Sequence, residues 1–179
     1  MQITGGFFNG RKIIAPKSLA VRPTLAKTRQ SVFNVLKSLI GKFDDKNFLD
    51  MFSGSGIMGL EALSRGFSSV VSVENDFKTA KIIQENYKNL GLPSNLLIKN
   101  SLKVDYKQSF DVIYADPPYF KGLYQKIIDK VRNDNLLKDK NSLLVLEKSA
   151  NVPIDFDCYK ILSEKKYSDT KIIFLKLNI

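Results

Sequence analysis

The alternation of strand-like and helix-like segments after residue 46 constrains the fold of this chain most strongly. Short apolar or β-branched runs alternate with amphipathic runs of helical spacing, a pattern typical of a parallel sheet wound with right-handed crossovers. Strands are predicted at 48–52, 70–73, 96–98, 111–115 and 143–146, and helices at 56–66, 77–90 and 120–132. Two last strands, at 159–165 and 171–177, flank a turn at 167–170 and predict a hairpin. We therefore expect an α/β fold with a seven-stranded, mostly parallel sheet that ends in an antiparallel hairpin.

The residue types that are missing exclude several kinds of chemistry. The chain has 179 residues, enough for one domain with an appendage, but it has no histidine and only one cysteine, Cys158. Triads of the Ser-His-Asp type, Cys-His pairs, histidine-ligated or multi-thiolate zinc and an internal disulfide are all excluded. We expect no metal site, so catalysis must use carboxylates, amides, hydroxyls, backbone groups or a bound cofactor.

A glycine-rich turn follows the first predicted strand and opens a helix. Gly54–Gly59 matches G-x-G-x-x-G, and Glu74 follows about twenty residues later, at the end of the second strand. Such a turn lets a ligand approach the backbone closely, and Glu74 can accept hydrogen bonds from both hydroxyls of a ribose. NAD, S-adenosylmethionine and a turn without a ligand all remain possible from these residues. Asp50 favours S-adenosylmethionine, because its carboxylate would crowd a pyrophosphate but could meet a cationic amino-acid group.

A second motif, Asp116-Pro117-Pro118-Tyr119, follows the fourth predicted strand. Ligands of open α/β sheets bind at the carboxyl ends of the strands, where this tetrapeptide is expected to lie. Asp116 and the Pro117 carbonyl can accept hydrogen bonds from the two hydrogens of an exocyclic amino group, which frees the nitrogen lone pair to attack a sulfonium methyl. Tyr119 offers a ring for a base to stack on. The motif therefore predicts methylation of an amino group on a nucleobase.

Three segments together, Asp50–Gly56, Leu60–Gly66 and Asp116–Tyr119, resemble class I methyltransferases of the RsmD type. An N-terminal signature is similar too, with Gly5-Gly6, Gly10-Arg11-Lys12 and Arg22-Pro23-Thr24. The resemblance spans nearly the whole chain. It implies a Rossmann-like fold and S-adenosylmethionine-dependent methylation of the N2 amino group of one guanine in 16S rRNA of the small ribosomal subunit.

The resemblance also extends the set of expected cofactor residues, since members of this family position the adenine just after the third strand, here Asn100 and Ser101. The full predicted cofactor set is Asp50, Phe52, Ser53, Gly54, Ser55, Gly56, Glu74, Asn75, Asn100 and Ser101. The chain departs from the family where Gln2 and Asn9 replace the usual arginines, and where Ala26 and Gln30 replace frequent acids. These departures concern RNA contacts rather than the reaction.

The first quarter of the chain is strongly basic. Residues 1–43 contain eight Lys or Arg and no acid, whereas the whole chain has a net charge of +10. We expect a small basic extension, residues 1–43, made of a hairpin (2–4 with 12–15) and a helix, ahead of a methyltransferase domain at 44–179. A positive segment of this kind is typical of a polyanion-binding surface, although a solvated basic arm remains an alternative. The predicted RNA-binding residues are Arg11, Lys12, Arg22, Thr24, Lys27 and Arg29.

The helix of this extension carries its apolar residues in one stripe, with Lys27 and Arg29 expected to lie off it. The stripe is Val32, Val35, Leu36, Leu39 and Ile40.

Two other functions remain open: a DNA adenine-N6 methyltransferase, which the tetrapeptide would serve equally well, and an RNA-binding module that senses the cofactor without turnover. The sequence has no apolar run of 18 residues and no signal pattern at its start. We therefore expect a cytoplasmic protein that does not enter membranes, acts on 16S rRNA or the small subunit, and is a monomer.

Overall fold

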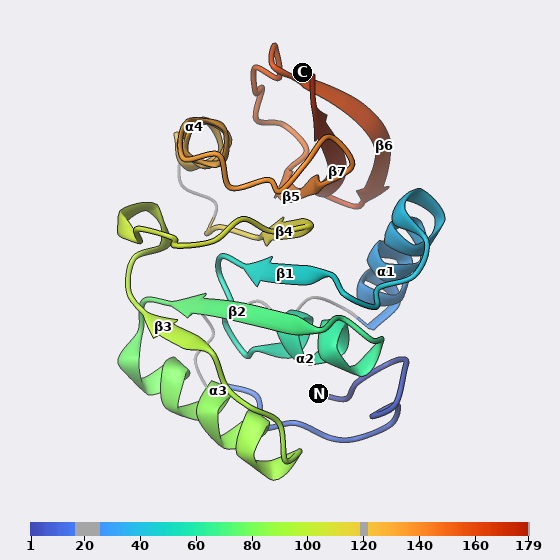
Figure 1. The fold of residues 1–179 in the computed structure, drawn as a ribbon, viewed down its shortest axis with the longest axis vertical. Helices are drawn as coiled ribbons and strands as arrows, with labels where there is room; N and C mark the ends of the chain where they lie inside the picture. The colour runs from blue at the N-terminus through green and yellow to red at the C-terminus, as the bar shows by residue number, and fades with distance from the viewer. Residues whose placement is uncertain (17–25, 119–121, 179) are drawn as a thin grey trace.

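A computed structural model describes residues 1–16, 26–118 and 122–178. In these residues, seven strands form one sheet in the order β3-β2-β1-β4-β5-β7-β6 (Figure 1). The strands are β1 (Asn47–Asp50), β2 (Ser69–Glu74), β3 (Leu96–Ile98), β4 (Val112–Ala115), β5 (Leu143–Ser149), β6 (Tyr159–Tyr167) and β7 (Thr170–Leu177). β1 to β5 pair in parallel, and β7 runs antiparallel to both β5 and β6. The predicted α/β fold and its terminal hairpin are confirmed.

The helices cover both faces of the sheet. They are α1 (Ala26–Ile40), α2 (Ile57–Ser64), α3 (Phe77–Asn89) and α4 (Leu123–Asn133), with a 3₁₀ turn, η1, at Ser101–Lys103. Successive strand residues point to opposite faces. Phe48 and Val112 accordingly pack in one buried cluster with α1, α2 and α3, and Leu49 and Ile113 pack in another with α4. No helix occurs in residues 150–158, as the shortness of that connection predicts.

The buried face of α1 is shifted from the predicted stripe. Val32 and Leu36 are buried as expected, but Leu39 is 38% exposed, and Phe33 is fully buried in its place. Arg29 lies on this buried face because it precedes Val32, Phe33 and Leu36 by three, four and seven residues. The prediction that Arg29 lies off the apolar face is therefore wrong.

The first 16 residues pack against α2 and α3 rather than forming a free-standing hairpin. Gln2 and Lys12 make a single antiparallel bridge, so the two predicted extended pieces meet over a much shorter length than expected. Ile3 and Ile13 are buried in the same cluster as Phe48 of β1. The division at residue 43 thus separates predicted roles, while the two sides share one core. No helix among the described residues has the length and apolar character needed to cross a membrane.

Candidate active site

The carboxyl ends of β1, β2 and β4 come together at one edge of the sheet. β1 lies between β2 and β4 and pairs in parallel with both. Asp50 ends β1, Glu74 ends β2, and Asp116 directly follows β4. The carboxylates predicted to serve the cofactor and the substrate therefore lie at neighbouring strand ends, where open α/β sheets bind ligands.

The loop after β1 is held against β2 by Ser53. The Ser53 N–H donates to the Val73 carbonyl at 2.9 Å, and the Val73 N–H donates to Ser53 Oγ at 3.0 Å. Ser53 Oγ in turn donates to the Asp50 carbonyl at 3.1 Å. The next residues then turn sharply through Gly54 and Gly56, whose φ angles of 52° and 79° favour glycine. Ser53 is 6% exposed, so its side chain serves to shape this loop.

Glu74 connects the glycine loop to β2. Its Oε2 accepts a hydrogen bond from the Gly54 N–H at 2.9 Å, and its Oε1 accepts one from the Asp76 N–H at 2.8 Å. Each carboxylate oxygen has a second acceptor position, so the carboxylate can hold the loop and also accept from hydroxyl groups of a ligand. The predicted spacing of about twenty residues between the glycines and this acid corresponds to a direct contact.

Asp50 is a buried carboxylate whose oxygens lack, in the ranges that the structure describes, the hydrogen bonds that buried acids usually make. The side chain is 1% exposed, and neither of its oxygens has a hydrogen-bond partner among the described residues. Burial raises the pKa of Asp50 to about 7, and the negative charge of Glu74 acts in the same direction, while the nearby Ser53 hydroxyl and the backbone groups of Gly59 and Phe52 offset part of the rise. Because a buried carboxylate without a partner is costly, Asp50 fits a site that receives a cationic group from a ligand.

The Asp116-Pro117-Pro118 segment leaves β4 at the same edge. Ala115 and Pro117 are buried, Asp116 is half-buried and Pro118 is exposed. Tyr119 lies outside the described residues, so its predicted stacking role stays a prediction. The segment thus brings Asp116 to the surface from a rigid strand end, as the proposed contact with a substrate amino group requires.

The predicted adenine contacts lie just after β3. Asn100 is exposed, and its side-chain oxygen accepts a hydrogen bond from the Leu102 N–H at 3.0 Å. Ser101 is 3% exposed, and its hydroxyl has no partner within the described part of the chain. Of the other predicted cofactor residues, Phe52 is half-buried, Ser55 is buried and Asn75 is exposed.

A buried pair next to the candidate site was not among the predicted site residues. The Tyr114 hydroxyl of β4 donates to the Glu147 carboxylate of β5 at 2.7 Å, and both side chains are buried. Tyr114 precedes Asp116 by two residues. The signal in the sequence was an acid at the end of an otherwise apolar strand. Nowhere in the described ranges do three acidic, cysteine or histidine side chains gather to hold a metal ion.

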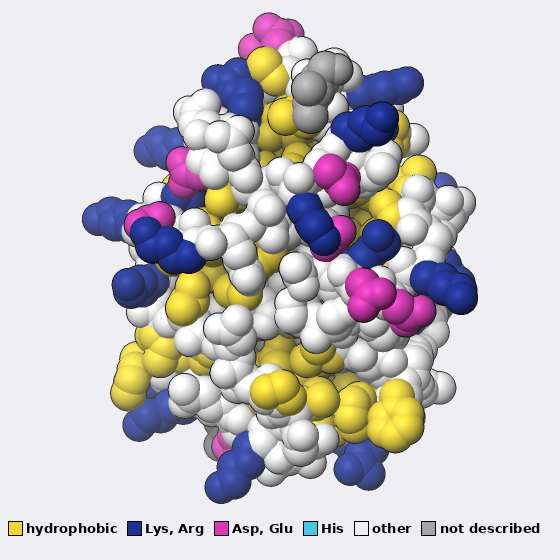
Figure 2. Space-filling view, in the orientation of Figure 1, with side chains coloured by type: hydrophobic (Ala, Val, Ile, Leu, Met, Phe, Trp, Pro, Cys, Tyr) yellow, Lys and Arg dark blue, Asp and Glu magenta, His cyan; other side chains and the backbone are white. Residues whose placement is uncertain are grey.

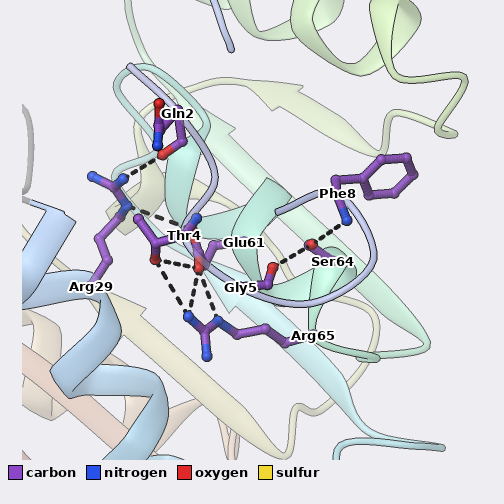
Figure 3. A network of polar contacts seen from close by, with 8 residues as sticks. All are labelled: Gln2, Thr4, Gly5, Phe8, Arg29, Glu61, Ser64 and Arg65. Carbon is purple, nitrogen blue, oxygen red and sulfur yellow. Dashed lines mark hydrogen bonds and ion pairs between the residues drawn. The ribbon is translucent and has the colours of Figure 1, made fainter. Parts of the chain in front are cut away.

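The N-terminal segment is fastened to α2 by a buried acid, Glu61 (Figure 3). Glu61 is fully buried and accepts hydrogen bonds from the Thr4 N–H and hydroxyl at 2.8 and 2.7 Å. It also pairs with Arg65 at 2.8 Å, and Arg29 Nε lies 3.7 Å from its second oxygen. Arg29 donates in addition to the Gln2 carbonyl at 2.7 Å. This network joins the N-terminal segment, α1 and α2.

These contacts correct the prediction that Arg29 binds RNA phosphate. Arg29 is 3% exposed and is engaged inside the protein, so it has no surface to offer a phosphate. Burial lowers the pKa of Arg29, while Glu61 raises it. Arg11, Lys12 and Lys27 are exposed, as RNA contacts require, and Arg22 and Thr24 lie outside the described residues.

Comparison with known proteins assigns the chain to a family. The family model described as Conserved hypothetical protein 95 matches residues 1–176. The Ribosomal RNA small subunit methyltransferase D of Buchnera aphidicola subsp. Acyrthosiphon pisum is 33% identical, over 88% of this chain and 85% of that protein. The protein of the same name from Escherichia coli K12 is 31% identical, over 81% of this chain and 73% of its own length.

A solved structure shares the fold over its full length. It is the putative methyltransferase yhhF from Escherichia coli, with a TM-score of 0.88 and 25% identity over 99% of this chain and 98% of that one. The resemblance noted from the motifs is thus confirmed: this chain belongs to the Conserved hypothetical protein 95 family, that of the RsmD-type methyltransferases.

Proposed function

We propose that this protein transfers a methyl group from S-adenosylmethionine to the N2 amino group of a guanine in 16S rRNA. The observation that carries the proposal is the buried, unpartnered Asp50 carboxylate, which lies at the same sheet edge as the Asp116-Pro117-Pro118 segment. The names of the relatives support an rRNA substrate of the small subunit. The guanine N2 position rests on the resemblance of the motifs.

The residues around the glycine loop fit S-adenosylmethionine, which supplies an electrophilic methyl group on a sulfonium when it is bound. Asp50 would accept the cationic amino-acid end, and Glu74 would accept the ribose hydroxyls. Gly54 and Gly56 let the backbone approach the cofactor without a Cβ in the way. Asn100 and Ser101 would contact the adenine, and the unpartnered Ser101 hydroxyl supports that placement. Phe52, Ser53, Ser55 and Asn75 would line or shape the same site.

The substrate side of the site activates an amino nitrogen without a strong base. Asp116 and the Pro117 carbonyl would each accept a hydrogen bond from the amino group, drawing the nitrogen toward tetrahedral geometry and exposing its lone pair to the methyl group. Once the methyl group has moved from sulfur to nitrogen, the nitrogen would lose one proton, which Asp116 would accept and pass to water. Tyr119 would stack on the base. The guanine must leave its helical stack to reach this pocket, at a cost of a few kcal/mol that is smallest in a loop.

The basic N-terminal residues would hold the RNA backbone. Arg11, Lys12 and Lys27 are exposed, and the planar guanidinium group of Arg11 suits bidentate binding of phosphate. In this proposal residues 1–43 carry RNA contacts, residues 44–179 carry the chemistry, and one copy of the chain suffices for both.

The test is methyl transfer from labelled S-adenosylmethionine to three substrates in parallel: small ribosomal subunits that lack the modification, protein-free 16S rRNA and double-stranded DNA. We expect label in the ribosomal samples and none in the DNA. Label in DNA alone would identify a DNA methyltransferase. Tight binding of S-adenosylhomocysteine and RNA with no transfer to any substrate would identify a module without turnover.

A further inference from the structure

The N-terminal turn presents an aromatic ring almost entirely to water. Phe7 is 89% exposed, and among the large hydrophobic side chains of the described residues the next most exposed, Phe77, is only 59% exposed. Figure 2 shows hydrophobic side chains gathered in the lower part of the view, over the region where Figure 1 places the N-terminal segment and α3. An exposed phenylalanine is not favoured by folding, since its ring gains nothing from the core.

The exposure of Phe7 does not come from a loose loop. Its N–H donates to the Ser64 carbonyl at 2.7 Å. The N–H of the following residue, Phe8, donates to Ser64 Oγ at 2.9 Å, as Figure 3 shows. Ser64 Oγ also donates to the Gly5 carbonyl at 2.6 Å. Gly6 fits so closely that an added Cβ would lie 1.8 Å from the Ser64 carbonyl oxygen. The backbone beneath Phe7 is therefore fixed to the end of α2.

The far side of the turn is closed as well. The Gly10 N–H donates to the Ile3 carbonyl at 2.9 Å, and the Arg11 N–H donates to the Phe8 carbonyl at 3.0 Å. The Phe7 and Phe8 rings meet edge to face, with centroids 5.0 Å apart and planes at 86°. Phe8 is half-buried, so one neighbour of the Phe7 ring is itself packed against the protein. The result is a preorganised aromatic ring that loses little freedom when a ligand stacks on it.

The charge of the N-terminal segment indicates which class of partner the ring would bind. Arg11 and Lys12 are exposed a few residues away, and residues 1–16 contain no acid. An exposed aromatic ring on a segment that carries cations and no acid of its own matches the surfaces that bind single-stranded nucleic acid by stacking bases and neutralising phosphates.

We propose that Phe7 is a stacking platform for an unpaired base of the RNA substrate, outside the pocket that holds the target guanine. This inference rests on the proposed function, because it takes RNA as the substrate. Arg11 and Lys12 would hold the phosphates on either side of the stacked base. Phe7 and the sheet edge that carries Asp116 would then bind the same RNA at two points.

The absence of tryptophan in this chain provides a direct probe. Phe7→Trp introduces a single indole, and its emission should be quenched when single-stranded RNA of the small subunit is added. A fully paired RNA duplex and inorganic polyphosphate, which offer charge without an unpaired base, should leave the emission unchanged. Ile161→Trp on β6 is the matched control, because Ile161 is 45% exposed on a strand at one edge of the sheet.

Binding of the same RNA should weaken when the ring is lost. Phe7→Ala and Phe7→Leu should raise the Kd for single-stranded RNA roughly 5- to 100-fold, with the leucine variant showing that apolarity alone does not suffice. Their thermal unfolding and S-adenosylhomocysteine binding should match the parent. The inference is overturned if both variants bind RNA as tightly as the parent, or if Phe7→Trp responds to polyphosphate as it does to RNA. Because the emission needs no methyl transfer, a parent protein that binds RNA but does not methylate it contradicts the proposed function alone.

Discussion

Asp50 shows how the environment of one side chain can indicate the charge of the ligand that a site binds. A carboxylate that is 1% exposed, without a hydrogen-bond partner among the described residues, costs free energy in the protein alone. Folding can tolerate it when the group is protonated, and burial raises the pKa of Asp50 to about 7 accordingly. A cationic group in the site would stabilise the charged form instead. Cofactor binding should therefore be linked to the ionisation of this residue.

The first prediction concerns that linkage. The affinity for S-adenosylhomocysteine should rise as the pH increases from about 5.5 to 7.5, by at most tenfold per pH unit. Asp50→Asn should bind more weakly and lose most of this pH dependence, because it has no proton to release. Isothermal titration calorimetry measures both effects. Asp44→Asn, at an exposed acid before β1, is the control and should keep the slope of the parent.

The second prediction concerns stability without ligand. The folded pKa of Asp50 lies above its unfolded value, so its contribution to stability is fully present below about pH 4 and is lost as the pH rises through about 7. The loss is on the order of 4 kcal/mol, because the pKa is raised by about three units at roughly 1.4 kcal/mol each. Asp50→Asn should flatten this part of the pH profile in urea unfolding. An unchanged profile would mean that Asp50 is not buried in the state described here.

The third prediction concerns Asp116. Asp116→Ala should lower the rate of methyl transfer by roughly 10²- to 10⁴-fold, because one positioned acceptor of the amino hydrogens is lost. Affinity for S-adenosylhomocysteine should stay within a few-fold of the parent, since the carboxylate meets the substrate rather than the cofactor. Asp105→Ala, at a surface acid, is the control. Near-normal turnover of the Asp116 variant would refute the assigned role.

At the scale of elements, the N-terminal segment depends on α2 for its shape. Glu61 on α2 binds both the Thr4 backbone and two arginines, and Ser64 at the end of α2 holds the turn that follows. Gly6 is required where the two elements touch, since its φ is 76° and an added Cβ would lie 1.8 Å from the Ser64 carbonyl oxygen. A Cβ on Gly5 would meet only the end of the Arg65 side chain. The second glycine of the N-terminal signature is thus explained by packing against a helix some sixty residues away in sequence.

The fourth prediction tests this attachment. Glu61→Gln should destabilise the protein by about 3–5 kcal/mol, because it leaves the buried Arg29 without its counter-charge. Adding Arg29→Met should recover part of that loss, so the double variant should be more stable than Glu61→Gln alone. Chemical denaturation measures the cycle, with Glu85→Gln at an exposed position of α3 as the control. Strictly additive losses would show that the pair is not coupled.

For the whole molecule, the sequence predicts what depends on local patterns. Strand positions, the terminal hairpin and the meeting of Asp50, Glu74 and Asp116 at one edge follow from periodicity and from the rule that ligands bind at carboxyl strand ends. The glycine turn is recognisable because its conformation needs particular residues.

Contacts between elements that are distant in sequence cannot be predicted from local patterns. Arg29 looked like a surface cation because the acid that pairs with it, Glu61, lies on another helix. The sequence does contain a signal for its burial. Arg29 precedes Val32, Phe33 and Leu36 by three, four and seven residues, which places it on the apolar face of α1. Tyr114 and Glu147 were missed as a pair for the same reason, since only the sheet order brings β4 and β5 together.

The fifth prediction concerns the charge of the whole N-terminal surface. If Arg11, Lys12 and Lys27 neutralise three phosphates, the slope of log K for RNA against log salt should include a contribution of about −2 from them. Replacing all three by Gln should remove that contribution and leave cofactor affinity unchanged. A control with the same charge change, at exposed lysines elsewhere, is the set Lys140, Lys160 and Lys166. Equal slopes for the two triple variants would show that the clustered N-terminal charges do not contribute to RNA binding.

The most direct test of the central claim is the identity of the methylated nucleoside. Small subunits lacking the modification are incubated with the protein and isotopically labelled S-adenosylmethionine, and the 16S rRNA is digested and analysed by liquid chromatography and mass spectrometry. The account predicts label in N2-methylguanosine, at one position in the rRNA, and its loss with Asp116→Ala. Label in N6-methyladenosine or in a ring-methylated base would contradict it, because Asp116 and Pro117 would then serve a different target atom.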